Sequence, residues 1–393
     1  MVAENCKELY ENAEDYVMQR KLSTFLSTEA EAKSTKKEQL TSLDYYERAE
    51  RQFIQLLETE ELDHKLAAGL VSASEFERAM ATAIEVAYSE TSNNDSAHRF
   101  LQRVLYRINR LKLFWYDDLK RYTNERSLYL RTVRDRIEDA WQEWELAQLD
   151  VAAYQEIDVR QTLIEWAAAD LDPTLSAESL FYRDRVTEAG YRRLVAIASL
   201  DGLVEASQLS RTLGGVGNEV HAVLTRLLIE EYGGGRLARK HSSHFTVMLE
   251  ELGMQTEPEA YLDLVPWGVL AVINHSFLLT ERKRYFLRYI GGLLYGELSI
   301  PAAFCNYRAA GERLGMSPAA MSYWELHIKV DELHGRWMLN DVALPLVSQY
   351  PADAWELLFG YDHQRLLSAR AGAAVARAVQ EADQAALSLK GDQ

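Results

Sequence analysis

Apolar residues recur at intervals of three and four along most of this chain, which is the spacing of one face of an α-helix. One such helix is predicted within residues 1–42, and others at about residues 43–59 and 74–88. The run 97–148 contains neither Gly nor Pro and predicts either one long helix or two. No segment alternates as a half-buried strand does, and no solenoid repeat is visible. The pattern therefore predicts an all-α fold.

A second series of helices follows the loop around Asp172-Pro173. The expected helices lie at about residues 177–190, 191–212, 217–232, 241–253, 264–280, 281–297, 301–314, 318–349 and, rich in Ala, 363–388. Gly233 to Gly235 should end one of them, because Gly adopts the left-handed conformation found after helix C-termini. Pro266 and Pro318 stand where first turns begin.

These patterns divide the chain into three parts. Residues 1–150 form an N-terminal helical region for which we predict a scaffolding or dimerising role, which makes the protein a homodimer. Residues 151–362 form a helical bundle, and residues 363–393 form a C-terminal helix and tail. In the first part, Ser96 is a candidate cap for the helix that follows the polar segment 89–96.

The run 97–148 contains a basic stretch with Arg99, Arg103, Arg107 and Arg110, followed by the aromatic residues Phe114 to Tyr116. The net charge of the chain helps to interpret this stretch. The chain has 43 Lys and Arg against 60 Asp and Glu, a net charge of -17. Such a field repels phosphate backbones. We therefore expect the basic face to pair with acidic neighbours, and we expect no nucleic-acid partner.

Two cysteines, Cys6 and Cys305, are too few for a disulfide framework, and a reducing compartment fits them. Cys305 is predicted to be a small core residue. The N-terminus has no apolar signal segment, and the apolar run Leu264 to Ile273 is too short to cross a bilayer. These features predict a cytoplasmic protein with no membrane partner.

The strongest chemical signal is the stretch Tyr323 to Trp337, which holds His327, Asp331 and His334. Each helical residue advances by about 100°, so these three side chains leave the helix along one narrow stripe. Two imidazoles and a carboxylate on such a stripe suit iron, manganese or zinc. A polar, solvated helix face is the alternative.

Candidate ligands also stand on other predicted helices. Glu297 is the one acid in the run from Ile290 to Phe304, where an unpaired carboxylate would be costly to bury. The second place, around Gly233 to Gly235, has Glu230 and Glu231 before the glycines and His241 and His244 after them. The residues alone leave both choices open. His221 and His275 are single histidines on apolar faces, and we predict hydrogen-bonded core residues there.

In this order, with Glu-Glu-Tyr-Gly-Gly-Gly at 230–235 and Gly-Glu-Leu at 296–298, the motifs resemble those of the heme-oxygenase-like diiron oxidases, often described as iron-containing redox enzymes. The resemblance covers about residues 175–350 and implies a heme-oxygenase-like helical bundle. It also implies six iron ligands, namely Glu231, His241, Glu297, His327, Asp331 and His334. Glu205 is the candidate for a further carboxylate that amine-oxygenating members use, with Glu219 as its alternative.

The resemblance further implies a nonheme diiron oxidase or oxygenase with two irons per chain, O2 as co-substrate, a small-molecule substrate and an external electron donor. N-oxygenation of an amine is favoured, because the chain is long and carries the candidate carboxylate Glu205. Oxidative C–C cleavage or decarboxylation of an amino or fatty acid is the alternative. A non-catalytic helical interaction protein of the same fold is the second alternative.

The resemblance does not assign the residues around the metals. Aromatic side chains are the candidates for contacts with substrate, and Glu325 and Glu332 are candidates for orienting the ligand histidines. The aromatic candidates are Phe245, Trp267, Tyr295, Phe304 and Trp324.

Overall fold

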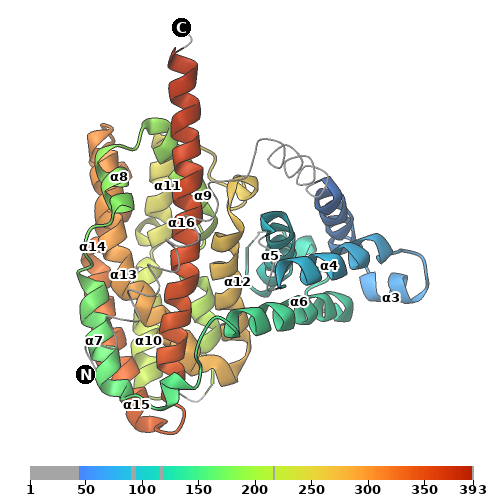
Figure 1. The fold of residues 1–393 in the computed structure, drawn as a ribbon, viewed down its shortest axis with the longest axis horizontal. Coiled ribbons are helices and arrows are strands. Elements are labelled where there is room, and N and C mark those ends of the chain that lie inside the picture. The colour runs from blue at the N-terminus through green and yellow to red at the C-terminus, as the bar shows by residue number, and fades with distance from the viewer. Residues whose placement is uncertain (1–43, 90–93, 116–117, 216, 392–393) are drawn as a thin grey trace, which may run out of the picture.

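The computed structural model describes residues 44–89, 94–115, 118–215 and 217–391, and every regular element within these ranges is a helix. The all-α prediction is confirmed. A smaller group of helices stands beside a larger helical bundle (Figure 1). The helix expected within residues 1–42, together with Cys6, lies outside the described residues.

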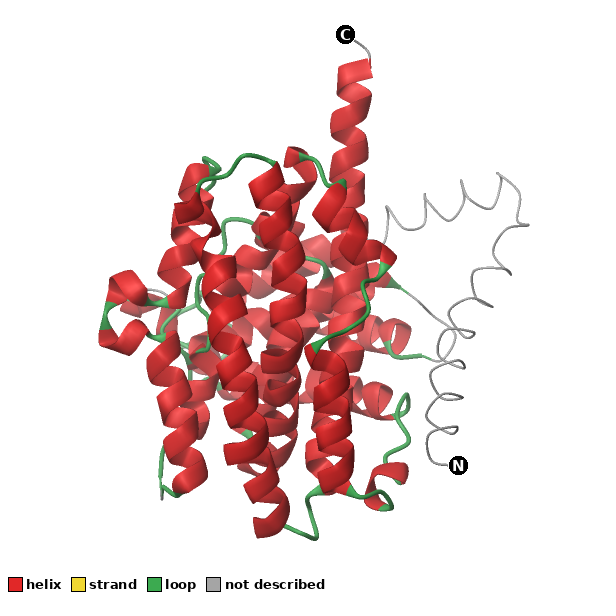
Figure 2. Cartoon of the chain, turned by 90° about the vertical axis from the view of Figure 1, so that its left-hand side faces the viewer, coloured by secondary structure: helices red, strands yellow, loops and turns green. Residues whose placement is uncertain are grey.

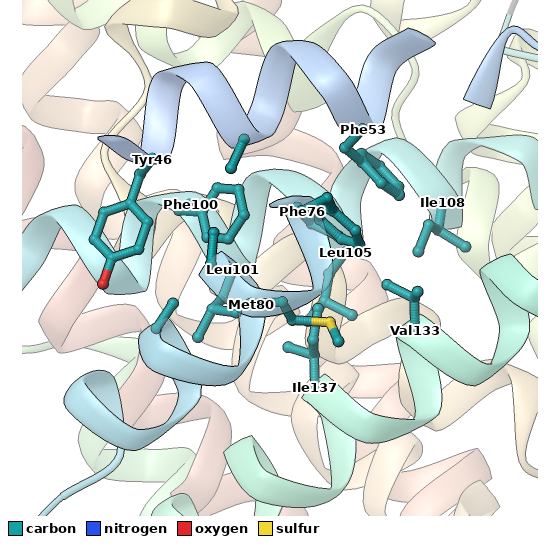
Figure 3. Close-up of a cluster of buried hydrophobic side chains, with 14 of the residues drawn as sticks. Tyr46, Phe53, Phe76, Met80, Phe100, Leu101, Leu105, Ile108, Val133 and Ile137 are labelled. Carbon is teal, nitrogen blue, oxygen red and sulfur yellow. The ribbon is translucent and has the colours of Figure 1, made fainter. Parts of the chain in front are cut away.

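The smaller group of helices comes from the N-terminal part of the chain. They are a helix over residues 44–57, α3 (Leu62–Ala67), α4 (Ser74–Ala87), α5 (Asp95–Asn109) and α6 (Leu128–Leu146). Their apolar faces meet in one core, in which Phe53 stacks on Phe76 with ring centroids 4.7 Å apart (Figure 3). Burial of these faces stabilises helices that would be marginal alone.

The run 97–148 forms two helices, because α5 ends at Asn109 and α6 begins only at Leu128. The cap of α5 is Asn94, whose side chain accepts a hydrogen bond from the backbone N–H of Ala97. The prediction of Ser96 as the cap is therefore wrong. Ser96 lies inside the first turn and donates its hydroxyl to Asn94.

The basic face of α5 pairs with acids, as predicted. The Nε atoms of Arg103 and Arg107 donate to Glu50 over 2.8 Å and 3.0 Å, and all three side chains are buried. Arg110 donates to Glu259, which lies in the connection between α11 and α12. These buried arginines therefore stabilise the packing of the N-terminal helices.

The helices of the larger bundle pack around α13 and α16 (Figures 1 and 2). Its elements are α7 (Val159–Leu171), α8 (Ala177–Asp184), α9 (Glu188–Gly202), α10 (Glu219–Glu231), α11 (His241–Glu251), α12 (Trp267–Glu281), α13 (Phe286–Arg313), α14 (Pro318–Trp337), α15 (Leu344–Gln349) and α16 (Trp355–Gly391). A π-helix, Met338–Ala343, joins α14 to α15. The N-terminal helices dock on the bundle mainly through α5 and α12.

Several predicted helix boundaries differ from the structure, for example that of the helix expected at 191–212, which is Glu188–Gly202 in α9. The helices expected at 281–297 and 301–314 are one helix, α13, which passes through Pro301. Proline removes one backbone hydrogen bond, but α13 packs against α14 and α16 along its length, and this packing outweighs the loss. The last helix begins at Trp355, eight residues before the expected position 363.

Glycine lets α13 and α16 approach closely. A Cβ atom on Gly291 would collide with the carbonyl oxygen of Leu357, and one on Gly292 would touch Gln364. Cys305, on the same helix, was predicted to be buried but is exposed, because it lies on the outward face of α13. Within the described ranges no helix has the length and apolar character needed to cross a membrane.

Candidate metal centre

Seven acids and histidines, all singled out in the sequence, converge inside the bundle. They form two groups, Glu205 with His241 and His327, and Glu231 with Asp331 and His334. Within each group the nearest ligand atoms lie within 4.8 Å of one another. The seventh residue, Glu297, places Oε2 3.4 Å from Nδ1 of His334. The side chains come from the loop after α9, from α10 and α11, and from α13 and α14.

Helix α14 supplies one face of the centre. It begins at Pro318 after Ser317, whose hydroxyl accepts a hydrogen bond from the N–H of Ala320. His327, Asp331 and His334 are all buried along its inner side. The predicted stripe is therefore confirmed, and the alternative of a solvated polar face is wrong.

A glycine turn brings Glu231 and His241 together, although they end and begin different helices. Gly233 has a φ of 62°, and a Cβ atom there would collide with the backbone of Arg239 and Lys240. The tight turn leaves Oε2 of Glu231 only 2.8 Å from Nδ1 of His241.

Glu231 also links the two groups. Its second oxygen, Oε1, lies 3.4 Å from Nδ1 of His334, while Oε2 faces His241. The rings of His241 and His327 meet with Nδ1 and Nε2 3.2 Å apart. One carboxylate thus spans the gap between the groups, an arrangement suited to two neighbouring metal ions.

The geometry separates the alternatives that the sequence left open. Glu230 points to the outer side of His334 and is one-third exposed, with a side-chain exposure of 34%. His244 lies beside Ser322, with its Nδ1 2.9 Å from the hydroxyl. Glu219 is exposed in the first turn of α10. Glu231, His241 and Glu205 face the centre instead.

Other groups orient the histidines. Nδ1 of His327 lies 2.8 Å from the carbonyl oxygen of Tyr323 one turn earlier, so Nε2 faces the centre, 3.0 Å from Oε1 of Glu205. The hydroxyl of Tyr323 donates to the same Glu205 oxygen over 2.6 Å. On the other group, Nε2 of His334 lies 3.3 Å from Glu230, which leaves Nδ1 facing inward.

The predicted orienting role of Glu325 and Glu332 is wrong. They form surface ion pairs with Lys329 and Arg336 on their own helix. Sequence reasoning missed the roles of Tyr323 and Glu230. The role of Tyr323 could have been inferred from its position one turn before His327, because a histidine ring on a helix can reach the carbonyl oxygen of the residue one turn earlier.

The carboxylates of this cluster outnumber its histidines, and burial together with their charges shifts the pKa values of both. Burial raises the pKa of Glu231 to about 8, helped by the charges of Glu205 and Glu297. Burial and Glu297 also raise the pKa of Asp331 well above its usual range. Burial alone would lower the pKa of His327, but Glu205 and its other acidic neighbours raise it to about 10. For His241, burial and His327 lower the pKa to about 4.

Two buried atoms at the centre have no hydrogen-bond partner among the described residues, namely Oε2 of Glu205 and Nδ1 of His334. Unsatisfied buried acceptors of this kind are costly, and a metal cation would satisfy both. Carboxylate oxygens and imidazole nitrogens in this mixture suit iron and manganese better than a thiolate site would. The residues therefore fit a pair of such ions.

A cavity of about 260 Å³ opens onto the centre. Five carboxylates line it, and no Lys or Arg is among the described residues of its wall. The acids are Asp201, Glu205, Glu231, Glu297 and Asp331. The cavity wall also includes His275 and Gln364.

Of the aromatic residues predicted to contact substrate, Phe304 lines this cavity. Phe245 and Trp324 lie in the core behind it, and Trp267 stacks on His98 of α5. Tyr295 packs edge-on against Tyr361. These four residues are absent from the described cavity wall, and packing explains their positions.

An all-α bundle with a buried cluster of carboxylates and histidines is the architecture of a carboxylate-bridged metalloprotein. Residues 192–368 match the model of a family described as iron-containing redox enzymes. This match confirms the predicted resemblance to that family.

One relative is nitrosourea synthase from Streptomyces achromogenes subsp. streptozoticus, which is 26% identical over 234 residues. The aligned part covers 56% of this chain and 48% of the relative. The chain thus spans about half the length of that protein.

Proposed function

We propose that this protein is a nonheme diiron oxidase or oxygenase that uses O2 to oxidise a small metabolite, with N-oxygenation of an amine as its reaction. The observation that carries the proposal is the pair of ligand groups joined by Glu231. One group, Glu205, His241 and His327, would hold one iron, and Asp331 and His334 with Glu297 would hold the other. The match to a family of iron-containing redox enzymes supports iron over manganese and zinc.

When bound, two ferrous ions would supply the electrons and open positions needed to bind and reduce O2. The protein residues would set the conditions for this chemistry. Tyr323 and Glu230 hold the ring nitrogens of His327 and His334 toward the centre. Tyr323 also donates to Glu205, which fixes that carboxylate's orientation. The surrounding helices bury the ligands and exclude bulk water.

The cavity supports an amine over an acid as the substrate. Four of the five carboxylates in its wall would bind iron, which leaves Asp201 as an acid able to face an amine, and no Lys or Arg among the described wall residues could bind a substrate carboxylate. The volume of about 260 Å³ suits a small metabolite. The product named for the relative, a nitrosourea, contains oxidised nitrogen, which agrees with N-oxygenation.

Oxidative C–C cleavage or decarboxylation of an amino or fatty acid is the second candidate. Such substrates present a carboxylate, and the described cavity wall offers it no Arg or Lys. A non-catalytic interaction protein is the third, and its burial of so many acids without cations is energetically unfavourable.

The test is anaerobic loading with Fe(II) followed by exposure to O2. We expect about two irons per chain and a transient visible absorption band after mixing. His327→Ala and Glu297→Ala should lose both, whereas Glu332→Ala, a surface change on the same helix as His327, should keep both. Wild-type protein that binds no iron, or whose iron does not react with O2, would contradict the proposal.

A further inference from the structure

Three buried titratable residues lie behind the cavity wall and have no part in the metal centre. His275 on α12 lines the cavity and is 1% exposed. His363 on α16 is equally buried, and its ring centroid lies 4.4 Å from that of His275. Glu145 on α6 is completely buried, and its Oε2 lies 3.8 Å from Nε2 of His363. The three residues form one continuous row from α6 to the cavity.

Burying these three polar side chains in the core is energetically unfavourable. Nδ1 of His275 and Nε2 of His363 have no hydrogen-bond partner among the described residues. Apolar side chains of similar size would fill the same space without that cost. Glu145 itself is well anchored, because it accepts hydrogen bonds from Arg370 over 2.6 Å and from Trp141 over 2.9 Å.

We propose that His275 and His363, with Glu145 as their buried counter-charge, form a relay that holds a proton and exchanges it with the metal cavity. His275 is the member in the cavity wall, and His363 connects it to the carboxylate. The separation of 3.8 Å between His363 and Glu145 closes to hydrogen-bond distance with a shift of about 1 Å.

The inference rests on the proposed function, which creates a demand for protons in a buried place. Hydroxylation of an amine nitrogen follows RNH2 + O2 + 2 H⁺ + 2 e⁻ → RNHOH + H2O. The two electrons come from an external reductant, and the two protons must reach the cavity. In the relay one imidazole gains a proton on one ring nitrogen and releases one from the other, so no bond other than N–H is made or broken.

The groups around His275 act on its pKa in opposite directions. Burial lowers the pKa of His275 well below its usual value, and His363 on α16 and Arg288 on α13 add to this effect. Glu145 on α6 and Gln364 on α16 act in the opposite direction. For Glu145, burial raises the pKa, but His363 and Arg370 together lower it to about 2. Glu145 therefore stays ionised at neutral pH and stabilises a proton placed on either imidazole.

Asp201 and Glu205 face the same cavity from α9 and the loop that follows it. Asp201, which is not one of the proposed metal ligands, is the acid there that can receive or supply the proton that His275 exchanges. A purely structural network would need no opening toward the cavity, whereas His275 forms part of the cavity wall.

The first experiment uses the full-length apoprotein with ¹⁵N-labelled histidine. We expect the ring nitrogens of His275 and His363 to titrate as a coupled pair, and Glu145→Gln to shift both titrations. His244 on α11 should not change, because its pKa is lowered by burial, His241 and His327 and raised by Glu205, and Glu145 is not among these groups. Independent titration of His275 and His363, or no response to Glu145→Gln, would overturn the relay. This readout stands whether or not the protein uses iron.

The second experiment compares His275→Gln, His363→Gln and the matched control His98→Gln after iron loading. We expect all three to bind iron as the wild type does. The first two should slow the O2 reaction at least about tenfold, abolish its solvent isotope effect and recover rate with added imidazole. Unchanged rates and isotope effects in both, or the same loss in His98→Gln, would overturn the relay. Absence of iron binding or of an O2 reaction in the wild type would instead count against the proposed function.

Discussion

The N-terminal helices and the bundle both bury charge, but they neutralise it differently. In the N-terminal region, Glu50 lies between Arg103 and Arg107. At the centre of the bundle, four carboxylates face one another across three histidines, and the pKa values of Glu231 and His327 shift strongly as a result. The first arrangement is complete within the chain. The second is stable only when protons or cations from outside neutralise it.

The comparison separates structural from functional buried charge. An acid whose cation lies on a neighbouring helix stabilises packing once the pair is formed. An acid surrounded by other acids and imidazoles raises the energy of the apoprotein, and this cost is what a metal ion removes. Burial by itself does not distinguish them, because Glu50 and Glu231 are exposed to almost the same extent, 7% and 6%.

The largest expected effect is at the centre of the bundle. Glu231→Ala removes the carboxylate shared by both ligand groups, so iron content should fall from about two per chain to nearly none. Metal analysis after gel filtration measures it. Glu325→Ala on the surface of α14 is the control and should bind iron normally. Full iron content in Glu231→Ala would show that the two groups do not depend on this residue.

In the N-terminal region, Glu50→Ala should affect stability and not iron. It leaves Arg103 and Arg107 buried without their acid, which costs about 3–5 kcal/mol in the free energy of unfolding. Chemical denaturation measures the change, and Glu58→Ala, on the exposed surface after the same helix, should be neutral. A loss of iron at unchanged stability would reverse the distinction between the two regions.

The Glu145 carboxylate is also paired within the chain, and its contribution to stability should depend on pH. Its pKa is lowered from 4.5 to about 2, so it stabilises the fold fully above pH 4.5 and this contribution is lost as the pH falls toward 2. The contribution amounts to about 3 kcal/mol. The difference in unfolding free energy between the wild type and Glu145→Gln should therefore be largest near pH 6 and shrink below pH 4. A constant difference across this range would contradict the assignment.

The smallest effect is expected from Glu230, which touches the centre only through His334. Glu230→Ala removes the acceptor near Nε2 of that ring and should weaken iron binding about tenfold without changing the free energy of unfolding. A competitive chelator titration measures the affinity. Glu219→Ala, at the exposed start of the same helix, is the control. An affinity equal to that of the wild type would mean that packing alone orients His334.

Much of the candidate centre could be predicted because its members stand out locally. Glu297 is an acid in an apolar run, and the spacing of His327, Asp331 and His334 places them on one side of a helix. The choice between Glu230 and Glu231 could not be made in this way. Both lie in the last turn of α10, and which one faces inward depends on how that helix is rotated against α14.

Other errors have the same origin in tertiary contacts. Cys305 sits in an apolar sequence yet is exposed, because the packing of α13 against α14 and α16 decides which face is covered. His275 was predicted to be a hydrogen-bonded core histidine and is buried, but its place in the cavity wall was not predicted. Its place in the cavity wall and its contact with His363 join helices that are distant in sequence, and helical periodicity carries no information about such contacts.

The position of Glu231 has a consequence for how the proposed centre fills. A carboxylate with one oxygen toward His241 and the other toward His334 makes the two ligand groups one thermodynamic unit. Binding of the first ion would deprotonate Glu231 and fix its orientation. The second ion would then bind to a carboxylate that is already ionised and oriented. By linkage, each ion strengthens the binding of the other by the same factor. Metal uptake should therefore be cooperative, with singly loaded chains rare at every stage of a titration.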